Sequence, residues 1–381
     1  MPVAPPRVGT AGREGARRVS AAGAVLVLGA TGFIGQEVAR RLLLRGRRVV
    51  ALARGPDDEA ARDRVGRAVG AAAGGRLEVV RGDLTLPGCG LGDTAVRRLR
   101  EQVETVINCA GDASFHPEAM APFRAGHIDG PRELAEQLHG ARLVRWGHLS
   151  TAYVCGRRSG TVGEFEADVG QTFHNPYERI KLESEMSIRE TGRRLGLGVT
   201  VFRPSIVVGE GPDSVGAGPS SLFFGLIRIV AALAQQPVGG SVSLRLPLAP
   251  HARFNIVPVE YVADAVVALV GHPGAADQTV HLVVEDAPSN QEMVATITER
   301  CGFSGVVLVD PRHAALHAPS PIEVRIERML AGYRDYLAQE LRFDDRNARR
   351  FLDRLGVARP QLSAETLRRL TDQALGAAVA G

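Results

Sequence analysis

The stretch AVLVLGATGFIGQEVARRLLLRG, residues 24–46, decides the fold of this chain. It begins with an apolar run that ends at Gly29. An amphipathic segment follows over 33–45. Gly46 comes directly after it, and glycine is common just beyond the C-terminus of a helix. A short apolar run, a glycine-rich turn and an amphipathic helix are typical of the first unit of a nucleotide-binding α/β fold. The stretch therefore predicts a dinucleotide site at its turn.

The turn GATGFIG, 29–35, contains three glycines with separate roles. Gly29 permits the tight turn, Gly32 lets the backbone approach a pyrophosphate, and Gly35 lets the helix pack closely on the strand. Backbone N–H groups at the start of a helix favour phosphate oxygens. The residues expected around the cofactor here are Gly29, Thr31, Gly32, Phe33, Ile34 and Gly35.

Apolar runs and helical segments alternate through the first half of the chain. The further runs lie at 48–53, 76–82, 105–111, 143–151 and 197–205, and the helical segments at 57–73, 92–102, 117–139 and 176–195. This alternation predicts an α/β fold with a Rossmann-type, doubly wound parallel sheet.

The alternation stops near residue 210, which predicts a second region. Helices are expected at 221–235, at 258–271 and from about 320 onward, with strand candidates at 241–246 and 279–284. We expect a disordered tail at 1–22, an NAD(P)-binding Rossmann domain at 23–210, and mainly a smaller substrate-binding cap with C-terminal helices at 211–381. Within the last range, 253–271 is expected to pack back on the Rossmann core. Open α/β sheets bind ligands at the carboxyl ends of their strands, so the cap should cover that edge.

Composition and charge exclude several classes of protein. The chain has 381 residues and a net charge of +4, but its basic residues are interleaved with Asp and Glu, so nucleic acid is not an expected partner. No apolar run reaches the ~18 residues of a membrane-spanning helix, so no integral membrane segment is expected. The four cysteines are far apart and form no metal-ligand spacing. We therefore expect reduced thiols, no metal site and a cytoplasmic location.

Three short segments after the second, third and fourth runs concern the cofactor. Arg54 stands where NAD-preferring sites have an acid, and an arginine there accommodates a 2′-phosphate, which favours NADPH over NADH. Asp83, followed by Leu84, is placed to hydrogen-bond the adenine. The small residues Ala110 and Gly111 leave room for the cofactor.

NPYERIKLESE, 175–185, contains the only lysine of a chain with 46 Lys and Arg. Tyr177 and Lys181 are four positions apart, so they share one face of a helix. A phenol is a poor acid or base at neutral pH until an adjacent ammonium stabilises its anion. An arginine would supply the charge as a rigid planar group instead. The segment STAY after the fifth run adds the hydroxyls of Ser150 and Thr151, either of which can hold a substrate oxygen.

In this order, GATGFIG, GDL, STAY and YERIK resemble the motifs of extended short-chain dehydrogenase/reductases. Longer stretches are similar to fatty acyl-CoA reductases and thioester-reductase domains. These stretches are GDLTLPGCGLG, HLSTAYVCG, NPYERIKLESE, FRPSIVVGE and RFNIVPVEYVADAV. The resemblance covers about 24–285.

The resemblance implies NADPH-dependent hydride transfer, with Thr151, Tyr177 and Lys181 as the catalytic set. Lys181 would also bind the nicotinamide ribose and lower the pKa of Tyr177. Pro204 and Ser205 would lie near the nicotinamide.

The chain departs from the family pattern at two places. His127 in HIDGP stands where the family has an asparagine that supports a proton relay, and no reductase-type C-terminal domain is evident in 290–381. We expect His127 to be neutral when the cofactor is bound, because a second cation close to Lys181 is disfavoured. The residues expected on the substrate side are Ser150, His127 and Phe223.

The leading hypothesis is an NADPH-dependent reductase that transfers hydride to a carbonyl or acyl-thioester carbon of a biosynthetic substrate. The alternatives are a ketone or enone reductase of a cyclic or aromatic metabolite, an epimerase or dehydratase of nucleotide-sugar type, and a non-catalytic NADP-binding regulator. The expected partner is a small-molecule or acyl-thioester substrate. Members of the family often dimerise through the helices expected at 117–139 and 176–195, so a homodimer is expected.

Overall fold

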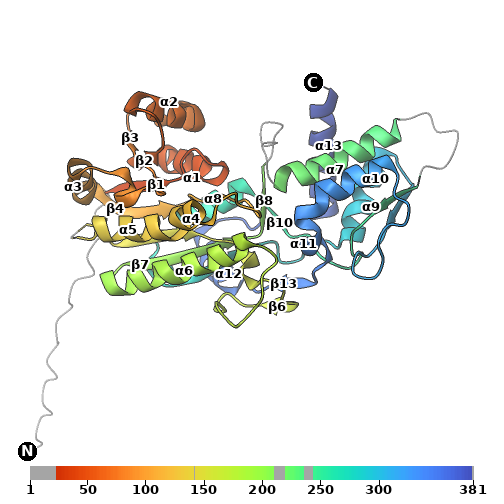
Figure 1. The fold of residues 1–381 in the computed structure, drawn as a ribbon. Helices are drawn as coiled ribbons and strands as arrows, with labels where there is room; N and C mark the ends of the chain where they lie inside the picture. The colour runs from red at the N-terminus through yellow and green to blue at the C-terminus, as the bar shows by residue number, and fades with distance from the viewer. Residues whose placement is uncertain (1–22, 141, 210–218, 236–242, 380–381) are drawn as a thin grey trace, which may run out of the picture.

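The structure is a computed structural model that describes residues 23–140, 142–209, 219–235 and 243–379. The expected tail at 1–22 lies outside these residues. A seven-stranded parallel sheet has the order β3-β2-β1-β4-β5-β7-β11 (Figure 1). Its strands are β1 (Ala24–Leu28), β2 (Val49–Ala53), β3 (Leu77–Arg81), β4 (Val103–Asn108), β5 (Arg145–Leu149), β7 (Gly198–Pro204) and β11 (Thr279–Leu282).

Helices cover both faces of this sheet (Figure 1). One face has α1 (Phe33–Leu44), α2 (Asp58–Val69) and α8 (Val259–Leu269), and the other has α3 (Asp93–Gln102), α5 (Gly130–Leu138) and α6 (Pro176–Leu195). Every residue of β1 and β4 is buried. Strands that are covered on both sides are mainly apolar, which is why they appear in the sequence as near-continuous runs.

The six runs of the first half form β1, β2, β3, β4, β5 and β7, so the prediction of a Rossmann-type sheet is confirmed. The seventh strand was not foreseen in this sheet. β11 lies in the 279–284 candidate of the second region, and it pairs with β7 at the edge of the sheet. α8 precedes it and packs on α1, where Asp264 forms ion pairs with Arg41 and Arg45 at 3.1 and 3.0 Å. Sheet and helix thus extend beyond residue 210, and the proposed domain boundaries stay a prediction.

The helix expected at 117–139 is interrupted. It consists of α4 (Met120–Arg124), a π-helical turn (Ala125–Asp129) and α5. Pro131 explains part of the break, because it has no N–H to bond the carbonyl of His127 four residues earlier. That carbonyl instead accepts a hydrogen bond of 2.5 Å from Ser184 Oγ.

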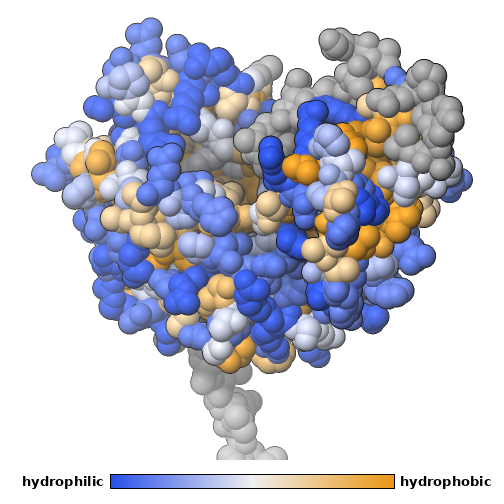
Figure 2. All heavy atoms as spheres, turned by 45° about the vertical axis from the view of Figure 1, so that its right-hand side comes forward, coloured by the Kyte–Doolittle hydropathy of each residue, from blue (hydrophilic) through white to orange (hydrophobic). Residues whose placement is uncertain are grey.

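A C-terminal lobe stands beside the carboxyl ends of the strands, on the right of Figure 1. Its helices are α7 (Pro219–Ala234), α9 (Asn290–Cys301), α10 (Pro321–Leu330) and α13 (Ala364–Val379). The lobe also contains a pair of strands, β9 (Leu244–Leu246) and β12 (Val306–Leu308). A second pair, β8 (Ile206–Val208) and β10 (Ile256–Pro258), lies between the lobe and the sheet. Figure 2 shows hydrophobic atoms gathered on this lobe, whereas most of the rest of that face is hydrophilic.

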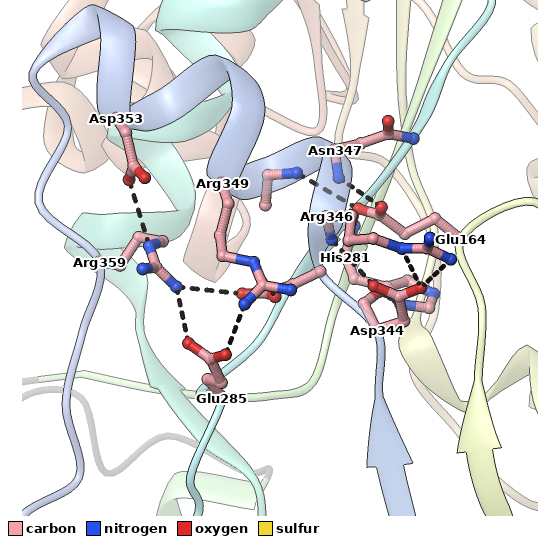
Figure 3. Close-up of polar contacts among 11 residues, drawn as sticks. Glu164, His281, Glu285, Asp344, Arg346, Asn347, Arg349, Asp353 and Arg359 are labelled. Atoms are coloured by element: carbon pink, nitrogen blue, oxygen red, sulfur yellow. Dashed lines mark hydrogen bonds and ion pairs between the residues drawn. The ribbon is translucent and has the colours of Figure 1, made fainter.

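A segment of the lobe returns to the edge of the sheet. It comprises α11 (Arg334–Ala338), β13 (Leu341–Phe343), which pairs with β6 (Gly160–Val162), and α12 (Arg346–Leu352). The buried Glu164 carboxylate fastens it, because it accepts from the backbone N–H groups of His281 at 2.9 Å and Asn347 at 2.6 Å (Figure 3). The C-terminal segment is thereby held next to the strand ends.

Within the described residues, no helix combines the length and the apolar character that crossing a membrane requires. The homodimer and the cytoplasmic location stay predictions.

Candidate active site

A cavity of about 700 Å³ lies where β1, β4, β5 and β7 end. Its wall has a glycine-rich side, a polar side and an aromatic side. The lining residues used below are Gly32, Phe33, Ile34, Cys109, Ala110, Gly111, Asp112, Phe115, His127, Leu149, Ser150, Thr151, Tyr153, Tyr177, Lys181, Pro204, Ser205, Tyr333 and Tyr336. Open α/β sheets bind ligands at this edge.

The glycine turn has the geometry that the sequence predicts. Gly29 has φ of +74°, and a Cβ on it would lie 2.8 Å from Ala110 Cα. A Cβ on Gly35 would lie 2.0 Å from Gly29 O, so only glycine permits this approach of helix and strand. α1 starts at Phe33 with Gly32 as its N-cap and without a side-chain cap. The first N–H groups of α1 are therefore free to bind an anion, which fits a dinucleotide pyrophosphate.

Two buried hydroxyls also fit a bound cofactor. Ser150 and Ser205 line the cavity and are 3% and 5% exposed. Within the described part of the chain, neither Oγ atom has a hydrogen-bond partner. A buried polar group without a partner is costly, so a ligand that reaches both hydroxyls would satisfy them.

The structure brings together only some of the predicted cofactor residues. Those that line the cavity are Gly32, Phe33, Ile34, Ala110, Gly111, Lys181, Pro204 and Ser205, while Gly29, Thr31 and Gly35 form the adjoining turn. Arg54, Asp83 and Leu84 lie outside this lining. Arg54 is exposed at the end of β2, and Leu84 is buried. Asp83 Oδ1 accepts from both the N–H and the hydroxyl of Thr85, at 2.9 and 2.8 Å.

Lys181 is buried in the polar wall, 5% exposed. Its Nζ donates a hydrogen bond of 2.5 Å to Leu149 O, at the end of β5. Burial lowers the pKa of Lys181 to about 8, and the nearby carboxylate of Glu185 opposes this change. Lys181 is therefore mostly charged at neutral pH.

Tyr177 and Thr151 lie on the same wall as Lys181. Burial raises the pKa of Tyr177 above its ordinary value, with Tyr333 as the next cause. The lowering of this pKa by Lys181, which the resemblance implies, stays a prediction. The phenol is protonated at neutral pH, which is the form that can donate a proton. Thr151 Oγ accepts from Tyr153 N–H at 3.3 Å, so its own hydroxyl proton is available to a ligand.

His127 lies in the π-helical turn and is 3% exposed. Its Nε2 is 3.1 Å from the backbone nitrogen and 2.9 Å from the carbonyl oxygen of Asp112. A Cβ on Gly111 would be 2.6 Å from His127 Cε1, so the glycine makes room for the ring. Burial, and after it the charge of Lys181, lowers the pKa of His127 to about 3. His127 is therefore neutral at physiological pH.

A buried polar network behind Lys181 was not foreseen. Ser184 Oγ donates to His127 O and lies 3.1 Å from His148 Nε2, and His148 Nδ1 lies 3.4 Å from Asn108 Nδ2. The sequence signal was present, because Asn108 and His148 are polar residues inside the apolar runs 105–111 and 143–151. Burial lowers the pKa of His148, so this ring is also neutral.

Sequence reasoning also missed the aromatic wall, formed by Phe115, Tyr153, Tyr333 and Tyr336. The prediction placed Phe223 on the substrate side instead. Phe223 belongs to α7, and its side chain is outside what the structure describes. The described residues include no group of three or more His, Cys, Asp or Glu that could hold a metal ion.

Comparisons with known proteins agree with this fold. An NAD-binding family model described as male sterility protein matches residues 27–266. An isonitrile lipopeptide synthase of Mycobacterium tuberculosis is 28% identical over 64% of this chain and 11% of its own length. A carboxylic acid reductase of Mycobacterium marinum is 24% identical over 68% of this chain and 24% of its own length. This chain thus spans a quarter or less of the length of these relatives.

A solved structure is similar over almost the whole chain. The terminal R domain of the myxalamid PKS-NRPS pathway has a TM-score of 0.77 and 24% identity, and the match covers 95% of this chain and 91% of that one. The likeness in fold therefore extends into 290–381. The sequence of this range gave no sign of a reductase-type C-terminal domain, whereas the likeness in fold includes the range.

Proposed function

The chain belongs to the male sterility protein family of NAD(P)-dependent extended short-chain dehydrogenase/reductases, and we propose that it reduces an acyl thioester with NADPH. One observation supports this proposal most strongly. Thr151, Tyr177 and Lys181 line a single cavity together with the start of α1, where the N–H groups are free. A proton donor, a cation and a cofactor-binding turn thus meet at one site, as carbonyl reduction requires.

The three side chains have separate roles in the proposed reaction. The hydroxyl of Thr151 donates a hydrogen bond to the substrate carbonyl oxygen and holds it beside Tyr177. Tyr177 donates its proton to this oxygen as negative charge develops there, and its raised pKa keeps the proton available at neutral pH. Lys181 stabilises the resulting phenolate and contacts the nicotinamide ribose. NADPH supplies the hydride when it is bound.

Reduction of a thioester gives a hemithioacetal, which collapses to an aldehyde and a free thiol. The thioester substrate is favoured by the relatives, which include a carboxylic acid reductase and the R domain of a PKS-NRPS pathway. Reduction of a ketone or enone is the second candidate, because Thr151 and Tyr177 act on the carbonyl oxygen and not on the sulfur.

We also propose that NADPH is preferred to NADH. Arg54 is exposed at the end of β2, next to the turn before α2, and no acidic residue precedes it in that strand. A guanidinium at this position is suited to a 2′-phosphate, whereas NAD-preferring sites place a carboxylate there.

The test is a substrate panel with the purified chain. NADPH oxidation is followed by absorbance with acyl-CoA and acyl-pantetheine thioesters, aldehydes, ketones and enones, and the aldehyde and thiol products are assayed separately. We expect thioesters to release thiol in step with NADPH consumption. Consumption with ketones or enones alone would support the second candidate. Tight NADPH binding without turnover in any arm would instead favour a non-catalytic regulator, and turnover of a nucleotide sugar without net NADPH consumption would favour an epimerase or dehydratase.

A further inference from the structure

Tyrosines are concentrated at the cavity. Aromatic residues make up only 5% of the chain, which has five tyrosines. Four of the five line the cavity, namely Tyr153, Tyr177, Tyr333 and Tyr336, and Phe115 lies among them. They come from four separate parts of the chain, so only the fold assembles them. Tyr177 is already assigned to proton donation, which leaves Tyr153, Tyr333, Tyr336 and Phe115, here called the aromatic wall.

The C-terminal segment is fixed to the catalytic helix through this wall. Tyr336 packs edge-on against Tyr153, with a ring-centroid distance of 4.6 Å, and is 5% exposed. Its hydroxyl accepts a hydrogen bond of 2.9 Å from Asn175 Nδ2, and Asn175 is the N-cap of α6. Because α6 includes Tyr177, Tyr336 sets the position of the wall relative to the reacting groups.

Phe115 lies close to both Tyr333 and the proton donor Tyr177. The ring centroid of Phe115 is 5.2 Å from that of Tyr333 and 6.0 Å from that of Tyr177. A Cβ on Gly332 would lie 3.3 Å from the Phe115 ring, so the glycine lets this ring pack against the C-terminal segment. Phe115 thus connects the loop after β4 to the segment that includes Tyr333.

The wall also presents polar atoms to the cavity. Tyr153 is 7% exposed and Tyr333 is partly exposed, and both residues, each with a phenolic hydroxyl, line the cavity. A ligand on this side of the cavity would contact the two rings. Gly32 of the cofactor turn and Ser205 line the same cavity.

We propose that the aromatic wall is the acyl subsite and selects compact acyl groups that contain a ring, with Phe115 and Tyr333 as the specificity-determining residues. The cavity of about 700 Å³ must also receive the nicotinamide end of the cofactor, which leaves room for a compact acyl group. Ring edges and faces pack favourably on another ring in offset or edge-to-face geometry, which a flexible alkyl chain cannot match. This inference rests on the proposed reduction of acyl thioesters.

The experiment compares benzoyl-CoA with heptanoyl-CoA, which have the same number of acyl carbons. Binding is measured by calorimetry on the NADPH-loaded Tyr177→Phe variant, which keeps the ring but lacks the proton donor, and kcat/KM is measured on the wild type. We expect benzoyl-CoA to be favoured roughly tenfold in both measurements, as a few ring contacts allow. Equal affinity for the two thioesters, or tighter binding of heptanoyl-CoA, would overturn the inference.

Variants assign the selection to the wall. Phe115→Leu and Tyr333→Leu should each lower kcat/KM for benzoyl-CoA about tenfold and leave heptanoyl-CoA within about threefold. Phe303→Leu, at a partly buried ring in the C-terminal lobe away from the cavity, is the matched control and should change neither. Equal losses on both thioesters would mean that Phe115 and Tyr333 do not select the acyl group. Preferential binding of benzoyl-CoA without any thioester turnover would support the subsite and refute the proposed reaction, so the two failures are distinguishable.

Discussion

Glu185 of α6 and Arg203 of β7 form a bidentate ion pair, with Oε1–Nε and Oε2–Nη2 distances of 2.9 and 2.6 Å. Their side chains are 2% and 1% exposed. Glu185 lies one helical turn after Lys181, and Arg203 directly precedes Pro204 of the cavity wall. The pair therefore joins the helix of the catalytic residues to the strand that ends at the cofactor side.

The ion pair predicts a large loss of stability when one partner is removed. Arg203→Met leaves the Glu185 carboxylate buried without its cation, which should cost about 3–5 kcal/mol of unfolding free energy. Arg300→Met is the matched control, because Arg300 and its partner Asp372 are 51% and 46% exposed and the change should cost at most about 1 kcal/mol. Denaturant unfolding measures both. Similar losses in the two variants would contradict the role of the buried pair.

Lys181→Arg should lower turnover by about a hundredfold or more although the charge is kept, because a guanidinium cannot take the position of the ammonium beside Leu149 O. Tyr177→Phe should reduce turnover at least as strongly and leave the NADPH affinity nearly unchanged. Steady-state kinetics and NADPH fluorescence titration separate the two effects. Arg179→Lys, at an exposed position of the same helix, is the control. Near wild-type turnover of Lys181→Arg would refute the special role of the single lysine.

Arg54→Asp should remove or reverse the preference for NADPH over NADH. The new carboxylate would repel the 2′-phosphate of NADPH and accept a hydrogen bond from the ribose 2′-hydroxyl of NADH, and both effects favour NADH. A tenfold change in the ratio of the two Kd values corresponds to about 1.4 kcal/mol. Titrations with both cofactors measure the ratio. A wild-type protein that binds NADH more tightly would show that Arg54 does not contact the cofactor.

His127→Asn restores the residue type of the family and should retain most of the activity, whereas His127→Leu should lose activity and change the pH profile. The reason is that a neutral imidazole or an amide can order a water beside Lys181, while leucine cannot. The profile of the wild type should show no titration of His127 itself near neutral pH, since its pKa is about 3. Equal pH–rate profiles for both variants would assign His127 a packing role only.

Glu164 predicts a specific pH dependence of stability. Burial raises the pKa of Glu164 to about 7, despite the hydrogen bonds from backbone N–H groups (Figure 3). The pKa of a glutamate in the unfolded chain is about 4.3. Between this pKa and the higher pKa of folded Glu164, the folded state keeps a proton that the unfolded state has lost. The free energy of unfolding therefore falls as the pH rises through this interval. Glu164→Gln should remove this decrease.

The test compares the unfolding free energy of the wild type with that of Glu164→Gln at each pH. His127 and His281 have lowered pKa values and contribute the opposite slope at acidic pH, but they do so in both proteins. Unfolding free energies across pH 4 to 8, roughly the interval that the two glutamate pKa values bracket, give the test. Glu299→Gln, at an exposed side chain, is the control. Parallel profiles for the wild type and Glu164→Gln would refute the prediction.

Local sequence was sufficient for the sheet and for part of the site. The glycine spacing of 29–35 and the spacing of Tyr177 and Lys181 are fixed by helix and turn geometry, which depends on neighbouring residues. The apolar runs predicted six of the seven strands for the same reason. β11 was assigned to the other region, because four residues with one histidine do not reveal which strand they pair with.

The sequence by itself determined the Rossmann-type fold, the cofactor turn and the candidate catalytic residues, since each depends on short-range periodicity or on a motif within one helix. Only the tertiary structure decided what faces these residues. Tyr333 and Tyr336 lie more than 150 positions from Tyr177 along the chain, and they reach the cavity because Glu164 and the pairing of β13 with β6 hold the C-terminal segment at the sheet edge. Contacts of this kind depend on packing between distant elements, and no local pattern of residues specifies them.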